Sequence, residues 1–135
     1  MATETTKVQA ESYAEGSGVT THDAGTGTVL GSFDGGDWVK YNAVDFGRGR
    51  NLFTADIGSE QPYAGGGFEI RIDSSTGPVI GTVTVENTGA WDTYLSQTAP
   101  ITSTLGIHDV YLKALGTSPG VANIDHFSVF TTIPR

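Results

Sequence analysis

The chain has 135 residues, of which 7 are basic and 15 acidic, so its formal net charge is −8 and argues against phosphate backbones and anionic membranes as partners. Glycine supplies 19 residues and cysteine none, which indicates many tight turns and leaves no disulfide framework. This length suits one domain, expected to be monomeric, and no apolar run is long enough to cross a membrane.

Short segments of alternating or β-branched residues follow one another along the chain, and turn residues separate them. Residues 7–13 read as a first strand, and the Gly/Thr-rich residues 16–27 as a loop. Residues 28–33 and 37–44 flank Asp34-Gly35-Gly36 and are expected to form a hairpin. Further strands are expected over residues 51–57, 67–73, 79–86, 91–98, 107–115 and 121–130. The pattern predicts an all-β protein, a two-sheet β-sandwich (jelly roll) of about nine strands.

The two ends of the chain differ from this strand-rich middle. Residues 1–6 and 132–135 are expected to be linker stubs, which places the folded module over residues 7–131. The first residues lack a basic and then apolar leader. We expect a module of a secreted protein whose signal peptide is not in this fragment.

The sequence carries little that indicates catalysis. His22, His108 and His126 do not have metal-ligand spacing, and there is no Gly-x-Ser-x-Gly nucleophile motif. A small glycosidase with paired carboxylates stays an alternative. Its candidate residues are Asp23, Asp34, Asp37, Glu69 and Asp125.

Hard oxygen donors stand near both ends of the chain, in Gln9-x-Glu11 and in Asn123-Ile124-Asp125. Calcium prefers such oxygens, and in a sandwich whose terminal strands are neighbours Glu11 and Asp125 could share one ion. The alternative is that both carboxylates are solvated surface groups, and the spacing does not decide between the two.

For each of the two tryptophans the sequence allows two interpretations, a sugar-binding surface residue or a core residue. Trp38 follows Gly36-Asp37 at the start of an amphipathic segment, and Trp91 stands at the junction of a turn and a strand. An exposed indole at such a place can stack on the C–H face of a sugar ring while polar neighbours bind the hydroxyls. A tryptophan can equally well be a core residue.

In these elements the chain resembles a family 6 carbohydrate-binding module, from about Lys7 to Phe130. The matching elements are Val8-Gln9-Ala10-Glu11-Ser12-Tyr13, Leu30-Gly31-Ser32-Phe33-Asp34-Gly35-Gly36-Asp37-Trp38-Val39-Lys40-Tyr41, Phe68-Glu69-Ile70-Arg71-Ile72-Asp73, Ile80-Gly81-Thr82-Val83, Thr88-Gly89-Ala90-Trp91-Asp92-Thr93-Tyr94 and Asn123-Ile124-Asp125-His126-Phe127. The resemblance implies a calcium-stabilised jelly roll that binds sugars without cleaving them.

The resemblance also implies two sugar sites. The edge site would use Trp91 and Asn123, but the tyrosine that usually completes it matches Ser32 here, and Tyr63 is a candidate replacement. The site on the concave sheet face would use Trp38 with Glu69.

The remaining implications concern the metal and the partners. Gln9, Glu11 and Asp125 match the ligands of a structural calcium, with backbone carbonyls completing the shell. The expected role is to hold a tethered glycoside hydrolase domain on plant or algal cell-wall polysaccharide: xylan, β-glucan or an agar-type galactan. A protein-adhesion sandwich is the third alternative.

Overall fold

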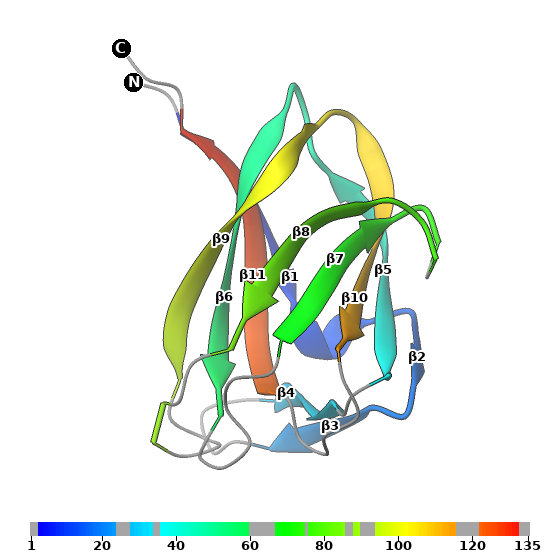
Figure 1. The fold of residues 1–135 in the computed structure, drawn as a ribbon, viewed down its shortest axis with the longest axis vertical. Helices are drawn as coiled ribbons and strands as arrows, with labels where there is room; N and C mark the ends of the chain where they lie inside the picture. Colours follow the sequence, from blue (N-terminus) through cyan, green and yellow to red (C-terminus); the bar gives the residue numbers. More distant parts are fainter. Residues whose placement is uncertain are drawn as a thin grey trace.

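The computed structural model describes residues 3–23, 28–33, 36–59, 67–74, 76–85, 88–89, 94–115 and 122–132. Within them, eleven strands form two sheets that face each other as a sandwich (Figure 1). All of the strand pairs are antiparallel. This confirms the predicted all-β sandwich. No helix in the described part of the chain is long and apolar enough to cross a membrane.

Sheet A contains the two terminal strands. It comprises β3 (Thr20–Asp23), β4 (Thr28–Phe33), β11 (Ala122–Thr132), β6 (Arg50–Gly58) and β9 (Leu95–Thr104) in that order, with β1 (Thr3–Gln9) also paired to β11. Sheet B comprises β2 (Glu15–Ser17), β5 (Trp38–Asp45), β10 (Ile107–Ala114), β7 (Gly67–Ile72) and β8 (Val79–Thr84) in that order.

The two-residue period of the strands divides inner from outer side chains. In sheet B the paired residues Val39, Leu112 and Ile70 are fully buried, and their neighbours along each strand are partly buried, except Tyr111, which is buried as well. Between the sheets, Phe53 stacks on Phe127 with ring centroids 5.4 Å apart. The alternation therefore decides which side chains remain available for binding.

Several boundaries differ from those expected. The first strand begins at Thr3, so Thr3 to Thr6, expected as a linker, pair with β11. It ends at Gln9 and a 3-10 helix, η1 (Ala10–Ser12), follows. The strand extends to Thr3 because pairing with β11 gives its backbone N–H and C=O groups hydrogen-bond partners that a free tail would lack.

The predicted hairpin of residues 28–33 and 37–44 is wrong. β4 pairs with β3 and β11 in sheet A, whereas β5 pairs with β2 and β10 in sheet B. The chain thus passes from sheet A to sheet B between Phe33 and Trp38. The Gly/Thr-rich residues 16–27, expected as a loop, contain the end of β2, which pairs with β5, and all of β3, which pairs with β4.

Register shifts interrupt five of the strand pairs, and two of these shifts are β-bulges beside polar side chains. Between β5 and β10, Asn42 and Ala43 together oppose Asp109, and Ala43 takes a φ of 53°. Between β11 and β6, Asp125 and His126 together oppose Asp56. The second bulge brings three polar side chains to one place on the outer face of sheet A.

Candidate functional site

A row of side chains crosses the outer face of sheet B and contains two of the predicted binding residues. The strand registers place Ser17, Trp38, Lys113, Glu69 and Thr82 opposite one another on β2, β5, β10, β7 and β8. We call these five residues the sheet B row. Trp38 and Glu69 therefore lie on one face, as expected, but Lys113 stands between them.

Trp38 is held outside the core by the packing beneath it. Its neighbour Val39 is fully buried between the sheets, so the indole points to the outer face. Tyr111 lies beside the indole with ring centroids 5.7 Å apart and planes tilted by 52°. Tyr111 is only 8% exposed, so it supports Trp38 instead of offering a surface of its own. The indole is thus a partly exposed aromatic platform with a fixed orientation.

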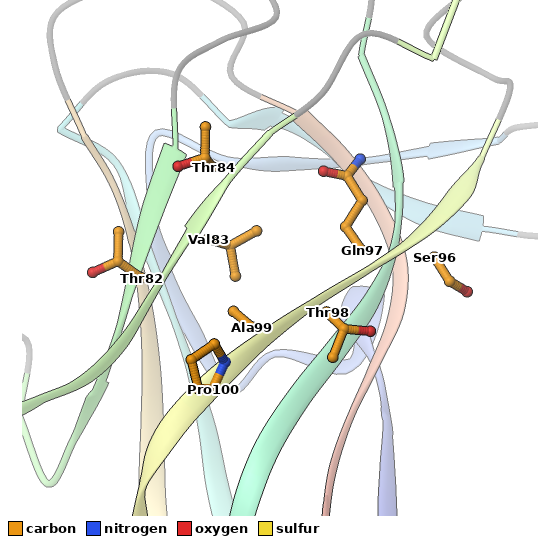
Figure 2. Close-up of a pocket in the computed structure, with 8 residues that line it drawn as sticks. All are labelled: Thr82, Val83, Thr84, Ser96, Gln97, Thr98, Ala99 and Pro100. Atoms are coloured by element: carbon orange, nitrogen blue, oxygen red, sulfur yellow. The ribbon is translucent and has the colours of Figure 1, made fainter.

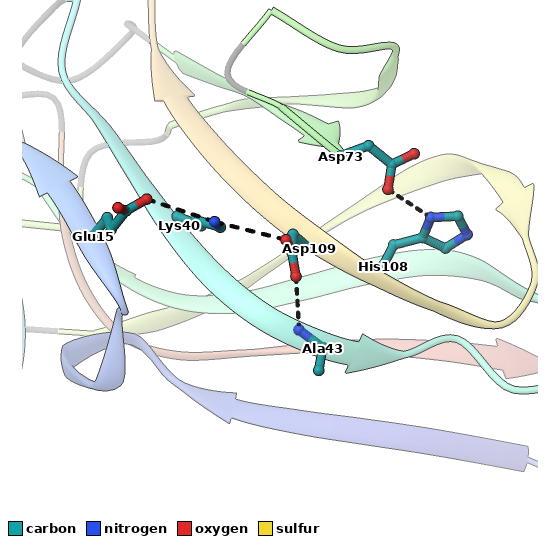
Figure 3. Close-up of polar contacts among 6 residues, drawn as sticks. All are labelled: Glu15, Lys40, Ala43, Asp73, His108 and Asp109. Carbon is teal, nitrogen blue, oxygen red and sulfur yellow. Dashed lines mark hydrogen bonds and ion pairs between the residues drawn. The ribbon is translucent and has the colours of Figure 1, made fainter.

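An ion-pair network fixes the other side of Tyr111. The Lys40 ammonium lies 5.8 Å from the centre of the Tyr111 ring, and Glu15 and Asp109 flank it at 3.6 and 3.7 Å. Figure 3 shows Lys40 between these two carboxylates. Desolvation lowers the pKa of Lys40, but Tyr111, Glu15 and Asp109 outweigh it and raise this pKa above its ordinary value. Lys40 stays charged and pins the ring that supports Trp38.

Glu69 is already bound to a neighbouring side chain. Its Oε1 accepts hydrogen bonds from Arg71 Nη2 at 2.7 Å and Nε at 3.0 Å. Arg71 is held in turn by the carbonyl of Gly77 at 2.8 Å. The carboxylate is therefore oriented in advance, and its second oxygen, which takes no part in these contacts, can accept a hydrogen bond from a sugar hydroxyl.

The predicted edge site is only partly within the described residues. Asn123 lies at the start of β11, where it pairs with Gly58 of β6, and its side chain is partly buried. Ser32 belongs to β4, next to Asn123, because β4 and β11 pair on either side of them. Trp91 and Tyr63 lie outside the described residues, and so does the side chain of Ser32.

The segment that leads to Trp91 is anchored beside Asn123. The hydroxyl of Thr88 accepts a hydrogen bond from the amide of Ser59 and donates one to the Ser59 carbonyl, each at 3.0 Å. Ser59 follows Gly58, the register partner of Asn123. The chain just before Trp91 is thus hydrogen-bonded to the residue that follows β6, the strand that pairs with Asn123 of β11.

The predicted calcium ligands lie around the junction of β1, η1 and β11. Gln9 is directly opposite His126, which places it next to Asp125, and η1 with Glu11 packs against β11 and β4. Glu11 Oε1 is buried and has no hydrogen-bond partner among the described residues. An unpaired buried carboxylate oxygen is costly, so these residues fit a bound cation.

The same region is braced from sheet B. The Tyr41 hydroxyl donates a 2.7 Å hydrogen bond to the carbonyl of Ala10. Burial raises the pKa of Tyr41 far above its ordinary value, and Glu11 and Tyr13 raise it further. Tyr41 therefore remains a neutral donor that holds η1, and with it Glu11, in position.

Asp125 has a second set of neighbours. His126 Nδ1 is 3.5 Å from Asp125 Oδ2, and His126 Nε2 is 3.6 Å from Asp56 Oδ2. The three side chains offer ligand atoms within 4.8 Å of one another. Asp125 and Glu69 lie on the outer faces of different sheets, so these two members of the proposed catalytic carboxylate set do not converge.

A groove of about 510 Å³ runs along the open side of the sandwich. Figure 2 shows that its lining comes from β8 and β9 alone. The lining residues are Thr82, Val83, Thr84, Ser96, Gln97, Thr98, Ala99 and Pro100. None of the eight is aromatic, so the groove has no platform on which a sugar ring could stack.

The sheet B row places an oriented indole beside charged groups on the outer face of a β-sandwich, an arrangement typical of a binding module. The family model for carbohydrate binding module (family 6) matches residues 9–131. The chain belongs to this family, and its role is to bind carbohydrate without catalysing a reaction.

Known proteins similar to the chain agree with this assignment. A family 6 module from Clostridium cellulolyticum in complex with xylose is 40% identical, with a TM-score of 0.86 over 93% of this chain and 96% of that one. A β-1,3-glucan-binding module from Bacillus halodurans is 37% identical, with a TM-score of 0.84 over 93% and 95%. An arabinoxylan arabinofuranohydrolase of Paenibacillus polymyxa is 34% identical over 128 residues, 89% of this chain and 20% of that protein. The chain thus spans about a fifth of the length of the curated relatives it matches.

Proposed function

We propose that the chain is the polysaccharide-binding module of a secreted glycoside hydrolase, and that it binds xylan or a β-glucan of cell walls. Its coverage of only about a fifth of a curated relative supports a place within a longer enzyme. Polymers of this size cannot enter a cell, which favours export of the parent protein. The module would act as a monomer that raises the local concentration of its catalytic neighbour on the polymer.

The position of Trp38 is the observation that carries this proposal. The indole lies on the outer face of sheet B, supported by Tyr111 and flanked by Lys113 and, one strand further, Glu69. A pyranose ring stacked on this indole would place its hydroxyls within reach of the ammonium and carboxylate groups. The edge site, with Trp91 and Asn123, would form the second binding surface.

The arrangement of the ends supports tethering. β1 and β11 pair from Thr3 and Thr132 onward, so the two ends of the described chain lie side by side. Figure 1 shows these ends at the top, whereas β5 and β11 start at the opposite end. β5 starts at Trp38, and Asn123 is the second residue of β11. A neighbouring domain joined at either terminus would leave both candidate surfaces facing the polymer.

Affinity electrophoresis and calorimetry on soluble xylan and β-glucan test the proposal. Replacing Trp38 with alanine should weaken binding about tenfold or more, because the stacking surface is lost. Trp91→Ala should have an effect of the same kind at the edge site. Binding left unchanged by both substitutions would reject the map of the two sites.

We also propose that Gln9, Glu11 and Asp125 hold a structural calcium ion. The buried, unpaired Oε1 of Glu11 supports an oxygen-binding cation at this junction. Although His126 and Asp56 are also close to Asp125, an imidazole is a poor ligand for this hard ion. Calcium would link β1, η1 and β11 and thereby take the place of a disulfide.

Calcium should stabilise the folded state by mass action. At a free concentration of 100 times the dissociation constant, the gain is about 2.7 kcal/mol, so a chelator should lower the melting temperature by roughly 8 °C. Glu11→Gln should abolish most of this response, whereas Glu15→Gln, on the other sheet, should retain it. A melting temperature that does not respond to chelator would remove calcium from the proposal.

A further inference from the structure

Three cations stand on the outer face of sheet B, and two of them already have carboxylate partners. Lys40 has Glu15 and Asp109 within 3.7 Å, and Arg71 has Glu69 at 2.7 Å. These contacts leave the charge of both cations compensated within the protein.

Lys113 differs from the other two. No carboxylate of the described residues lies within ion-pair distance of its ammonium group, although Glu69 is its direct register partner. Arg71 instead holds the Glu69 carboxylate, through two hydrogen bonds to one oxygen. Among the residues that the structure describes, the positive charge of Lys113 therefore has no compensating carboxylate at short range.

The position of this charge bears on the ligand. Lys113 is the direct cross-strand partner of Trp38, and its side chain is partly buried. Cross-strand partners on one face have their Cβ atoms about 5 Å apart. A group attached to a sugar ring that stacks on Trp38 would therefore meet the ammonium, in a place from which the ring excludes water.

We propose that the Trp38 surface binds a glycan segment that carries a carboxylate, such as a uronic acid residue, and that Lys113 is the residue that recognises this charge. The inference rests on the proposed sugar binding at this surface and adds the chemical class of the ligand. Lys113 would form an ion pair with the carboxylate, while Trp38 stacks on the sugar ring and Glu69 accepts a hydrogen bond from a hydroxyl group.

The overall charge of −8 does not prevent this recognition. At physiological ionic strength charges beyond about 8 Å are largely screened, so the groups close to the ligand dominate. The interaction should therefore be short-ranged and should weaken only moderately with added salt.

The test compares two xylo-oligosaccharides of equal length, one unsubstituted and one carrying a single glucuronic acid residue, by calorimetry. The wild-type protein should bind the acidic compound more tightly. Lys113→Gln should lower affinity for the acidic compound about tenfold, as expected for one charge-assisted pair, and affect the neutral compound less than about twofold. Lys113→Arg should retain the preference. Lys7→Gln, which removes an exposed lysine from the outer face of sheet A, is the matched control.

The outcomes separate this inference from the proposed function. If the neutral compound binds in a Trp38-dependent way but the acidic one binds no better, the inference is wrong and sugar binding stands. An equal loss for both compounds in Lys113→Gln would make Lys113 a donor to hydroxyl groups and also overturn it. Binding of neither compound would overturn both proposals.

Discussion

His108 holds together two segments at the far end of sheet B. Its Nδ1 lies 2.9 Å from Asp73 Oδ1 and its Nε2 lies 2.8 Å from the carbonyl of Leu105. Figure 3 shows the contact between His108 and Asp73, and Asp73 has a φ of 74°. The contact with Asp73 raises the pKa of His108, although desolvation opposes the shift. Protonation of one imidazole therefore contributes to the stability of the fold.

This contribution should depend on pH. Because the folded-state pKa is raised, the added stability is fully present below the ordinary value of about 6.5 and is lost as the pH rises through the folded-state pKa. His108→Gln should lower the free energy of unfolding more at pH 5.5 than at pH 8.5, measured by urea denaturation.

A matched variant isolates the role of the charge. Asp73→Asn keeps a residue type that tolerates positive φ and removes the carboxylate, so it should show the same pH trend. A cost that is equal at the two pH values in both variants would contradict the assigned ion pair.

At the scale of the element, the bulge in β5 serves the candidate site. Asp109 accepts a hydrogen bond from the amide of Ala43 at 3.0 Å through Oδ1, and its Oδ2 faces Lys40. The bulge thus holds Asp109 in place, and Asp109 in turn holds Lys40 beside the Tyr111 ring. Tyr111 packs against Trp38. A local irregularity of one strand contributes in this way to the orientation of the indole.

Ala43 is exposed and has a φ of 53°, a conformation that disfavours side chains with a Cβ. Ala43→Gly should raise the free energy of unfolding by about 0.5 to 1 kcal/mol, because relief of the strain exceeds the entropy cost of glycine. Ala14→Gly, at an exposed position without positive φ, should lower it instead. Equal destabilisation by both, in chemical denaturation, would show that position 43 is not strained.

Strand positions could be predicted more readily than strand partners. The alternation of apolar residues predicts β6, β7, β8 and β10 within one or two residues, because it reflects burial of one side of each strand. Partners depend on contacts far apart in the chain, so the expected hairpin of β4 and β5 failed. β2 and β3 were missed because exposed Gly and Thr residues give no burial pattern.

At the scale of the whole molecule, the same limit applies to the site. The resemblance placed Trp38 and Glu69 in one predicted site, and the strand registers place both residues on the outer face of sheet B. It did not reveal that β10 lies between their strands, and for that reason Lys113 and Tyr111 were missed. The sequence shows Lys113 as a polar residue next to an apolar Leu112, which indicates an outward-facing strand position. Only the strand register shows that Trp38 and Glu69 are its neighbours.

The sandwich as a whole separates attachment from binding. Large aromatic side chains fill the space between the sheets, and the described chain ends lie together, away from Trp38 and Asn123. Such a rigid scaffold can keep an indole ready for a flat sugar ring, with little ordering cost when the ligand binds. The central claim is that this surface, and not the aromatic-free groove between β8 and β9, receives the glycan.

Titration of the ¹⁵N-labelled module with a xylo-oligosaccharide, followed by two-dimensional NMR, tests that claim most directly. The chain has 2 tryptophans, so its indole N–H signals are easily assigned with Trp38→Phe. We expect saturable shifts of the Trp38 indole signal and of the amides of Lys113 and Glu69. Saturable shifts confined to Ser96, Gln97 and Thr98 of the groove, with both indole signals unmoved, would contradict the account.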